Sequence, residues 1–155
     1  MTTMEIARAE TPTDYAEARA LFEEYAAGLG FSLCFQGFDR EIEALPAIYG
    51  PPEGALLVLR SEQRACGCVG VRRLSGDTCE MKRLYVQVPF RAAGAGRQLA
   101  LEALAVSRSL GYRRMVLDTL PAMQAARALY SALGFAEIPP YYEGPCGALY
   151  LEKML

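Results

Sequence analysis

The sequence predicts an α/β (α+β) fold, in which a mixed, mostly antiparallel sheet of six to seven strands carries about four helices on both faces. Two observations predict it. Three apolar segments at 55–60, 65–74 and 78–87 are separated by short turns, which is typical of an antiparallel meander. After them, helix-like and strand-like segments alternate to the end of the sequence.

The N-terminal part predicts a short strand followed by helices. The strand is expected at about 6–9. Thr11 and Pro12 predict the start of the first helix, because threonine caps helices well and proline is tolerated at the first helical position. This helix is expected to end near Ala27, and a second helix is expected at about 39–48.

The C-terminal part predicts two more helices and three strands. In the segment 98–110, apolar residues recur every three or four positions, which indicates an amphipathic helix. A strand at 115–119 and a helix at 121–133 follow. Closing strands are expected at 135–138 and 148–154.

The composition limits the classes of function. With 155 residues, 52% of them apolar, we expect one domain over residues 1–155 with a packed core. A net charge of −2 argues against nucleic-acid binding. No apolar run reaches the ~18 residues of a membrane helix, and none resembles a signal peptide. The sequence thus predicts a soluble cytoplasmic protein without a membrane partner.

The absence of histidine excludes Ser-His and Cys-His nucleophiles and His-ligated metals, so no metal site is predicted. Five cysteines are an odd number, which rules out a complete disulfide framework. Cys66 and Cys68 alternate on a predicted strand and are expected to share a face as buried free thiols.

The most informative segment connects the third predicted strand to the helix after it. It reads Arg91, Ala92, Ala93, Gly94, Ala95, Gly96 and Arg97. Its glycines let the backbone approach a ligand closely, and the first amides of a helix lack internal partners. Together with the helix dipole and two arginines, they predict a polyphosphate site. Leu99 stands where a dinucleotide fingerprint needs glycine, and no Walker Lys-Ser or Lys-Thr follows. The alternative is a glycine-rich turn that only begins a helix.

The pattern Arg-x-x-Gly-x-Gly, after an apolar strand and before an amphipathic helix, resembles motif A of the GNAT acyltransferase superfamily. Glu80 lies eleven residues before Arg91, as in many GNAT enzymes. Tyr130, followed by Gly134 and Phe135, is similar to the superfamily's Tyr-x-x-x-Gly-Phe signature. The resemblance implies acetyl-CoA as cofactor. It also implies a sheet that splays between strands four and five to admit the pantetheine arm.

The resemblance implies catalytic roles for Tyr130 and Glu80. Tyr130 would donate a proton to the departing thiolate, because a tyrosine with a pKa near ~10 is protonated at neutral pH. The alternative is that Tyr130 only packs on the sheet. Glu80 would be the base, or else a strand residue paired with Lys82 two positions on. Met123 stands where many family members carry asparagine, so one polar contact is missing.

The resemblance also implies which residues bind the cofactor and the acceptor. Backbone amides of Leu84, Tyr85 and Val86 would bind pantetheine and polarise the thioester carbonyl. The acceptor pocket would be formed by Phe31, Phe35, Phe38, Tyr141 and Tyr142. Aromatic walls near the carboxylates of Asp39 and Glu143 suit a cationic amine with an apolar body.

The predicted function is acetyl-CoA-dependent N-acetyl transfer to a primary amine of a small molecule or peptide terminus, by direct attack. One alternative is a non-catalytic acyl-CoA-binding sensor, and another is a transferase of a longer acyl chain. Dimers are common in the superfamily, so a homodimer is one expected state.

Overall fold

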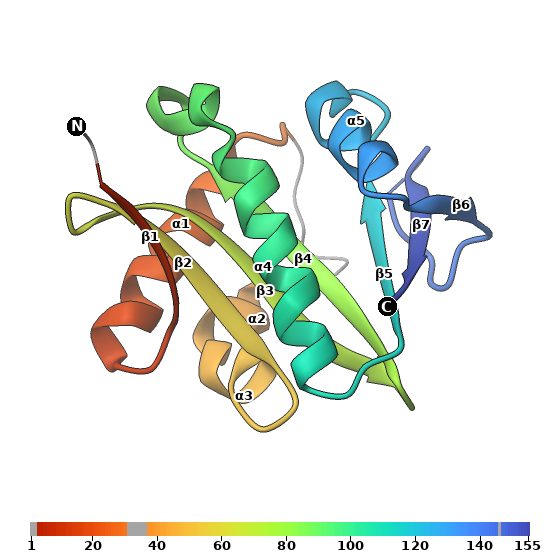
Figure 1. The fold of residues 1–155 in the computed structure, drawn as a ribbon, viewed down its shortest axis with the longest axis horizontal. Coiled ribbons are helices and arrows are strands. Elements are labelled where there is room, and N and C mark those ends of the chain that lie inside the picture. Colours follow the sequence, from red (N-terminus) through yellow and green to blue (C-terminus); the bar gives the residue numbers. More distant parts are fainter. Residues whose placement is uncertain (1–2, 31–36, 146) are drawn as a thin grey trace.

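The computed structural model describes residues 3–30, 37–145 and 147–155. Seven strands form one sheet (Figure 1). They are β1 (Met4–Arg8), β2 (Ala55–Ser61), β3 (Arg64–Ser75), β4 (Thr78–Val86), β5 (Arg114–Thr119), β6 (Ala136–Ile138) and β7 (Leu149–Met154). The order is β1-β2-β3-β4-β5-β7-β6; β4 and β5 are parallel, and the other neighbours are antiparallel. The predicted mixed sheet is confirmed.

Helices cover both faces of the sheet. They are α1 (Pro12–Ala27), α2 (Phe38–Glu43), α3 (Leu45–Tyr49), the 3-10 helix η2 (Val88–Ala93), α4 (Ala95–Ser109) and α5 (Gln124–Ala132). In Figure 1, α4 crosses the front of the sheet, whereas α1, α2 and α3 lie behind it. No helix in the described ranges is long and apolar enough to cross a membrane.

The segment expected as one helix at 39–48 forms two. The chain leaves the first at Ala44, which has φ −128° and ψ 32°. Pro46 lies in the first turn of the second, where a missing N–H breaks no helical hydrogen bond. The described chain thus has five α-helices where about four were expected.

The predicted start of α1 is confirmed by a complete capping box. The Asp14 N–H donates to Thr11 Oγ1 at 3.1 Å. In return, Asp14 Oδ2 accepts the N–H groups of Glu10 at 2.8 Å and Thr11 at 3.0 Å. These bonds satisfy backbone donors that a helix start leaves unpaired.

The core has two apolar layers, one on each face of the sheet. The α4 layer includes Leu57 and Leu99, and the α1–α3 layer includes Leu56 and Phe22. Leu56 and Leu57 enter opposite layers because successive strand side chains alternate in direction. Fully burying one such side chain contributes about 1.5–3 kcal/mol.

One extra residue in β3 changes which face its cysteines occupy. Leu59 pairs with Gly67 and Arg60 with Ala65, so Cys66 has no partner in β2. Such a bulge reverses the alternation. Cys66 therefore joins the α4 layer and Cys68 the α1–α3 layer. The prediction that they share a face was wrong because the bulge leaves no mark in the sequence.

Candidate active site

The site begins where β4 and β5 separate. Their register covers three residue pairs and ends at Glu80 and Val116. Beyond that point the two strands diverge (Figure 1), which confirms the expected splay. A narrow cavity of about 50 Å³ lies there, with walls from β4, β5, α1 and α5.

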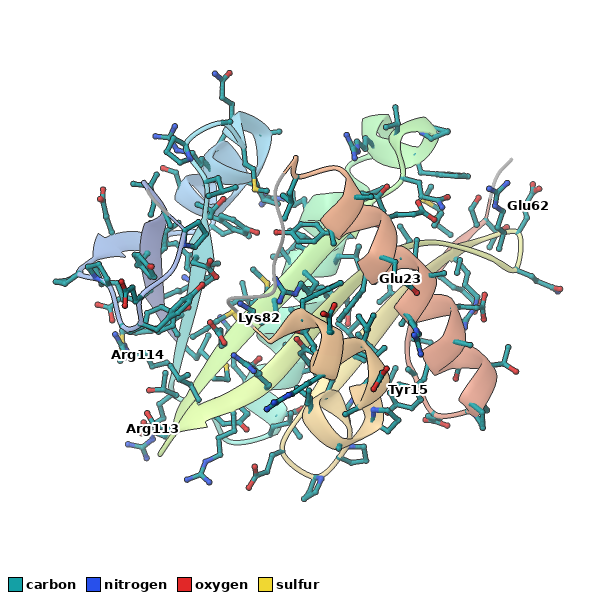
Figure 2. The ribbon with its side chains drawn as sticks, turned by 180° about the vertical axis from the view of Figure 1, so that it is seen from behind. Tyr15, Glu23, Glu62, Lys82, Arg113 and Arg114 are labelled. Carbon is teal, nitrogen blue, oxygen red and sulfur yellow. The ribbon has the colours of Figure 1, made fainter. Side chains whose placement is uncertain are left out.

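A second bulge shapes the β4 side of this cavity. Between paired positions, β3 has one residue whereas β4 has two, Arg83 and Leu84. Arg83 has φ +62°, a left-handed conformation that non-glycine residues seldom adopt. Because of the bulge, Lys82 and Arg83 both lie on the face covered by α1–α3; Figure 2 labels Lys82 there, beside β4.

The predicted phosphate loop is formed by η2 and the first turn of α4. Gly94, with φ 71°, begins α4 in the left-handed region that glycine tolerates. The next amides, of Ala95, Gly96 and Arg97, have no acceptor within the helix. A Cβ added at Gly94 or Gly96 would meet nothing within 4 Å, so the space beside these amides is open. This geometry fits a polyphosphate.

Arg91 connects the predicted phosphate loop to the end of β4. Its Nε donates to the carbonyl oxygen of Val86 at 2.7 Å. Its guanidinium lies 5.8 Å from the ring centre of Tyr85. Ala92 and Ala93 lie in η2, and Arg97 is exposed in the first turn of α4.

Tyr130 lines the cavity from α5, on the α4 side of the sheet. Its side chain is 6% exposed and packs edge-on against Phe135, with ring centres 5.7 Å apart. Burial raises the pKa of Tyr130 above its usual value, so the hydroxyl keeps its proton at neutral pH. The missing asparagine leaves Met123 beside it in the cavity wall.

Glu80 lies on the opposite face, with both carboxylate oxygens engaged. Arg72 donates to Oε1 from Nη2 at 2.8 Å and from Nε at 2.9 Å. The Tyr141 hydroxyl donates to Oε2 at 2.6 Å, and Lys82 Nζ lies 3.8 Å from the same oxygen. Glu80 is 1% exposed and is not part of the cavity wall.

The predicted acceptor residues divide into three groups. Tyr141 and Tyr142 pack against Tyr150, with ring centres 5.3–5.6 Å apart, so no ligand fits between them. Phe38 is buried, 5.3 Å from the Arg83 guanidinium. Phe31 and Phe35 lie outside the described residues.

Asp118 on β5 was missed by the sequence analysis. It lines the cavity, and its side chain is 13% exposed. The Tyr142 hydroxyl donates to its Oδ2 at 2.8 Å, and Lys82 Nζ lies 3.5 Å from its Oδ1. The signal was a single acid in the apolar strand 115–119, on the face opposite Leu117.

Residues 12–135 match the model of the acetyltransferase (GNAT) family. The chain belongs to this family. It is an N-acetyltransferase, and GNAT enzymes take the acetyl group from acetyl-CoA. The chain is 41% identical to an uncharacterized N-acetyltransferase of Schizosaccharomyces pombe, over 90% of this chain and 87% of that protein. It is 34% identical to the IAA acetyltransferase of Azospirillum brasilense, over 67% of this chain and 70% of that protein.

Solved GNAT structures have the same fold. A GNAT acetyltransferase of Staphylococcus aureus Mu50 superposes with a TM-score of 0.82 at 16% identity, covering 98% of this chain and 99% of that one. The ribosomal-protein-S18-alanine N-acetyltransferase of Escherichia coli gives 0.73 at 20% identity, covering 98% and 94%.

Proposed function

We propose that this GNAT enzyme moves an acetyl group from acetyl-CoA to a primary amine of a small molecule or peptide terminus, by direct attack. The observation that carries the proposal is the cavity between β4 and β5. Tyr130 borders it from the α4 side of the sheet, and Lys82, Arg83 and Asp118 border it from the α1–α3 side. A thioester and an amine that enter from opposite faces would meet there.

The chain's own residues fit acetyl-CoA. The amides of Ala95, Gly96 and Arg97 would hold its pyrophosphate. Backbone groups of Leu84, Tyr85 and Val86, beyond the last β4–β5 pair, would hold the pantetheine arm. When bound, the coenzyme supplies an electrophilic thioester carbonyl. The small cavity favours an acetyl group over a longer acyl chain.

Tyr130 is the proposed acid. A buried, protonated phenol can give its proton to a departing thiolate, and such proton transfer contributes about 10²–10⁴-fold in rate.

The acceptor amine must be neutral when it attacks. At pH 7, deprotonation costs roughly 4.6 kcal/mol for a lysine-like amine and about 1 kcal/mol for an α-amine. On the α1–α3 side of the cavity, the carboxylate of Asp118 and the ring of Tyr25 suit a cationic amine with an apolar body.

We also propose that residues 1–155 act as one domain, in the cytoplasm and without nucleic acid. The free, buried thiols of Cys66, Cys68 and Cys79 are consistent with a reducing compartment.

A mass-spectrometric screen tests the proposal. Protein, acetyl-CoA and a pooled library of primary amines are incubated, and acetylated products are identified. We expect Tyr130→Phe to lower product formation at least ~100-fold while it still binds coenzyme A. Tyr15→Phe, in α1 and away from Lys82 (Figure 2), is the matched control and should keep full activity. Coenzyme binding without any product from the native chain would favour the sensor alternative, which Met123 in the cavity wall mildly supports.

A further inference from the structure

Two carboxylates lie close to Lys82 on the α1–α3 face of the sheet, and they differ in access to the cavity. Lys82 Nζ is 3.8 Å from Glu80 Oε2 and 3.5 Å from Asp118 Oδ1. Asp118 lines the cavity that Tyr130 also lines, whereas Glu80 does not. Glu80, which the family spacing indicates, thus lies outside the cavity wall. Asp118, which lines the cavity, belongs to none of the family motifs quoted above.

Glu80 has the contacts of a structural residue. The Arg72 guanidinium contacts Oε1 through two nitrogens, and the Tyr141 phenol donates to Oε2 at 2.6 Å. Because the side chain is 1% exposed, neither a water nor an amine reaches it without displacing Arg72 or Tyr141. Its hydrogen bond holds the Tyr141 hydroxyl, and with it the start of the loop that follows β6.

The Asp118 carboxylate has acceptor positions that its neighbours do not occupy. Oδ2 accepts one short hydrogen bond, from Tyr142. The Oδ1 contact with Lys82, at 3.5 Å, is longer than the 2.7–3.2 Å of a good N–H···O bond. A carboxylate has about four acceptor positions, so Asp118 can accept an ammonium group without losing either neighbour.

The charge of Asp118 also acts across the cavity. Burial is the main cause that raises the pKa of Tyr130, and Tyr25 and Asp118 add to it. In Tyr25 the pKa is raised by burial, with Asp118 again contributing. The negative charge of Asp118 therefore raises the pKa of both tyrosines that border the cavity, Tyr25 from α1 and Tyr130 from α5.

We propose that Asp118 binds the acceptor's ammonium group and accepts the proton that it loses before attack, while Glu80 is a positioning residue for Tyr141. This assignment rests on the proposed transferase function and identifies the acceptor as a primary ammonium ion. It makes Asp118 the catalytic carboxylate of this chain.

The proton balance is as follows. R–NH3⁺ gives one proton to Asp118, which passes it to water. The freed lone pair forms the C–N bond, and the C–S bond breaks. Tyr130 gives its proton to the departing sulfur and is reprotonated by the second amine proton. The sum is one amide, one thiol and one released proton.

The pH dependence of this step depends on the groups around Asp118. In the described part of the chain, the charged and titratable ones, besides Glu80, are Lys82 and Arg83 from β4, Tyr25 from α1, Tyr130 from α5, Tyr141 and Tyr142 from the loop after β6, and Tyr150 from β7. Burial raises the pKa of Tyr25, Tyr130 and Tyr142, which keeps them protonated across the acid range. These three tyrosines therefore contribute no acid limb to the rate profile.

The test uses an amine that the native chain acetylates in the screen above. Profiles of kcat/KM against pH are measured for the native chain, Asp118→Asn, Tyr142→Phe and Glu80→Gln. Thermal unfolding and coenzyme A binding are measured for each variant, to separate misfolding from lost chemistry.

We expect Asp118→Asn to lower kcat/KM at least ~100-fold with coenzyme A affinity unchanged. Tyr142→Phe should shift the acid limb to higher pH, because a carboxylate that loses a hydrogen-bond donor binds its proton more tightly. Glu80→Gln should keep most of kcat, because neither Glu80 nor Tyr141, whose hydroxyl it holds, lines the cavity.

The assignment is overturned if folded Asp118→Asn keeps its rate within ~3-fold, or if the acid limb does not move in Tyr142→Phe. It is also overturned if Glu80→Gln loses kcat at unchanged KM, because Glu80 would then be the base. These results leave the transferase function intact. A native chain that binds coenzyme A but acetylates no amine overturns the transferase function itself, and the Asp118 assignment with it.

Discussion

Arg83 forms a bidentate ion pair with Glu41 in the interior. Arg83 Nε lies 3.0 Å from Glu41 Oε2, and Nη2 lies 2.8 Å from Oε1. The Tyr49 hydroxyl also donates to Oε2, at 2.9 Å. Burial alone would raise the pKa of the Glu41 carboxyl, but the hydrogen bonds and charge of Arg83 outweigh it and lower the pKa. The pair joins α2 to the bulge of β4, beside the cavity.

Removing one partner of this pair should be costly. Glu41→Gln removes the carboxylate that faces the buried Arg83 charge, so we expect a loss of about 3–5 kcal/mol in unfolding free energy. The same substitution in the exposed pair, Glu23→Gln beside Arg19, should cost less than ~0.5 kcal/mol. Urea denaturation of both variants measures the contrast, and equal losses would show that the buried pair is not specially stabilising.

The ring of Tyr49 leaves no room for a side chain at position 70, which is glycine. A Cβ at Gly70 would lie 2.6 Å from Tyr49 Cε1 and 2.8 Å from Cδ1, and that ring is fully buried. We expect Gly70→Ala to destabilise the fold by about 1–3 kcal/mol through overpacking. Gly96→Ala is the control, because a Cβ there meets nothing within 4 Å. A Gly70→Ala variant as stable as the native chain would mean that the Tyr49 ring moves freely.

The cap of α1 should make stability depend on pH. Backbone hydrogen bonds from Glu10 and Thr11 lower the pKa of Asp14 from 3.8 to about 2. Because the pKa is depressed in the folded state, the stabilisation is complete above about 3.8 and is lost as the pH falls through about 2. We expect Asp14→Asn to cost about 1 kcal/mol near neutral pH, and the difference to shrink in this window.

Thermal unfolding of native and Asp14→Asn protein across the acid range checks this prediction. All other carboxyl groups are the same in the two proteins, so the difference between the two curves reports on Asp14 and on its coupling to Glu17 through Arg60. A difference that persists unchanged at the acid end would assign the effect to geometry and not to charge.

The phosphate loop should separate stability from coenzyme affinity. Gly96→Asp places a carboxylate at the start of α4, where the helix dipole favours it by about 0.3–1 kcal/mol. The same charge repels a pyrophosphate and fills the open space at Gly96. We therefore expect equal or higher thermal stability with coenzyme A affinity at least ~10-fold lower, measured by calorimetric titration. Ser109→Asp, at the other end of α4, should leave the affinity unchanged.

Much of the fold was predictable because its signals are local. Thr11 and Asp14 begin α1 through contacts within four residues. The meander was legible because the turns between β2, β3 and β4 are short. The start of α4 was predicted at Gln98, but the helix begins at Ala95. The prediction was late because glycines, which suit a phosphate loop, have low helix propensity.

The site was harder to predict because its signals are not local. The bulges at Cys66 and Arg83 reverse side-chain alternation, and they depend on pairing with another strand. Asp118 was not singled out because its hydrogen-bond donor, Tyr142, lies 24 residues away along the chain. Spacing singled out Glu80, but only the contacts of Arg72 and Tyr141 reveal that both oxygens of its carboxylate accept hydrogen bonds inside the protein.

The short β4–β5 register has a mechanical consequence. The C-terminal part of the sheet, from β5 onward, is joined to the rest through three backbone-paired positions at one end. Widening the far end requires no backbone hydrogen bond between these strands to break, and only side-chain contacts resist it. The junction between β4 and β5 thus becomes less stiff from Glu80 toward Val86, whereas β3 pairs with β4 up to Val86. Native-state hydrogen exchange should show this gradient among the β4 amides that face β5, with slow exchange near Glu80 and faster exchange toward Val86.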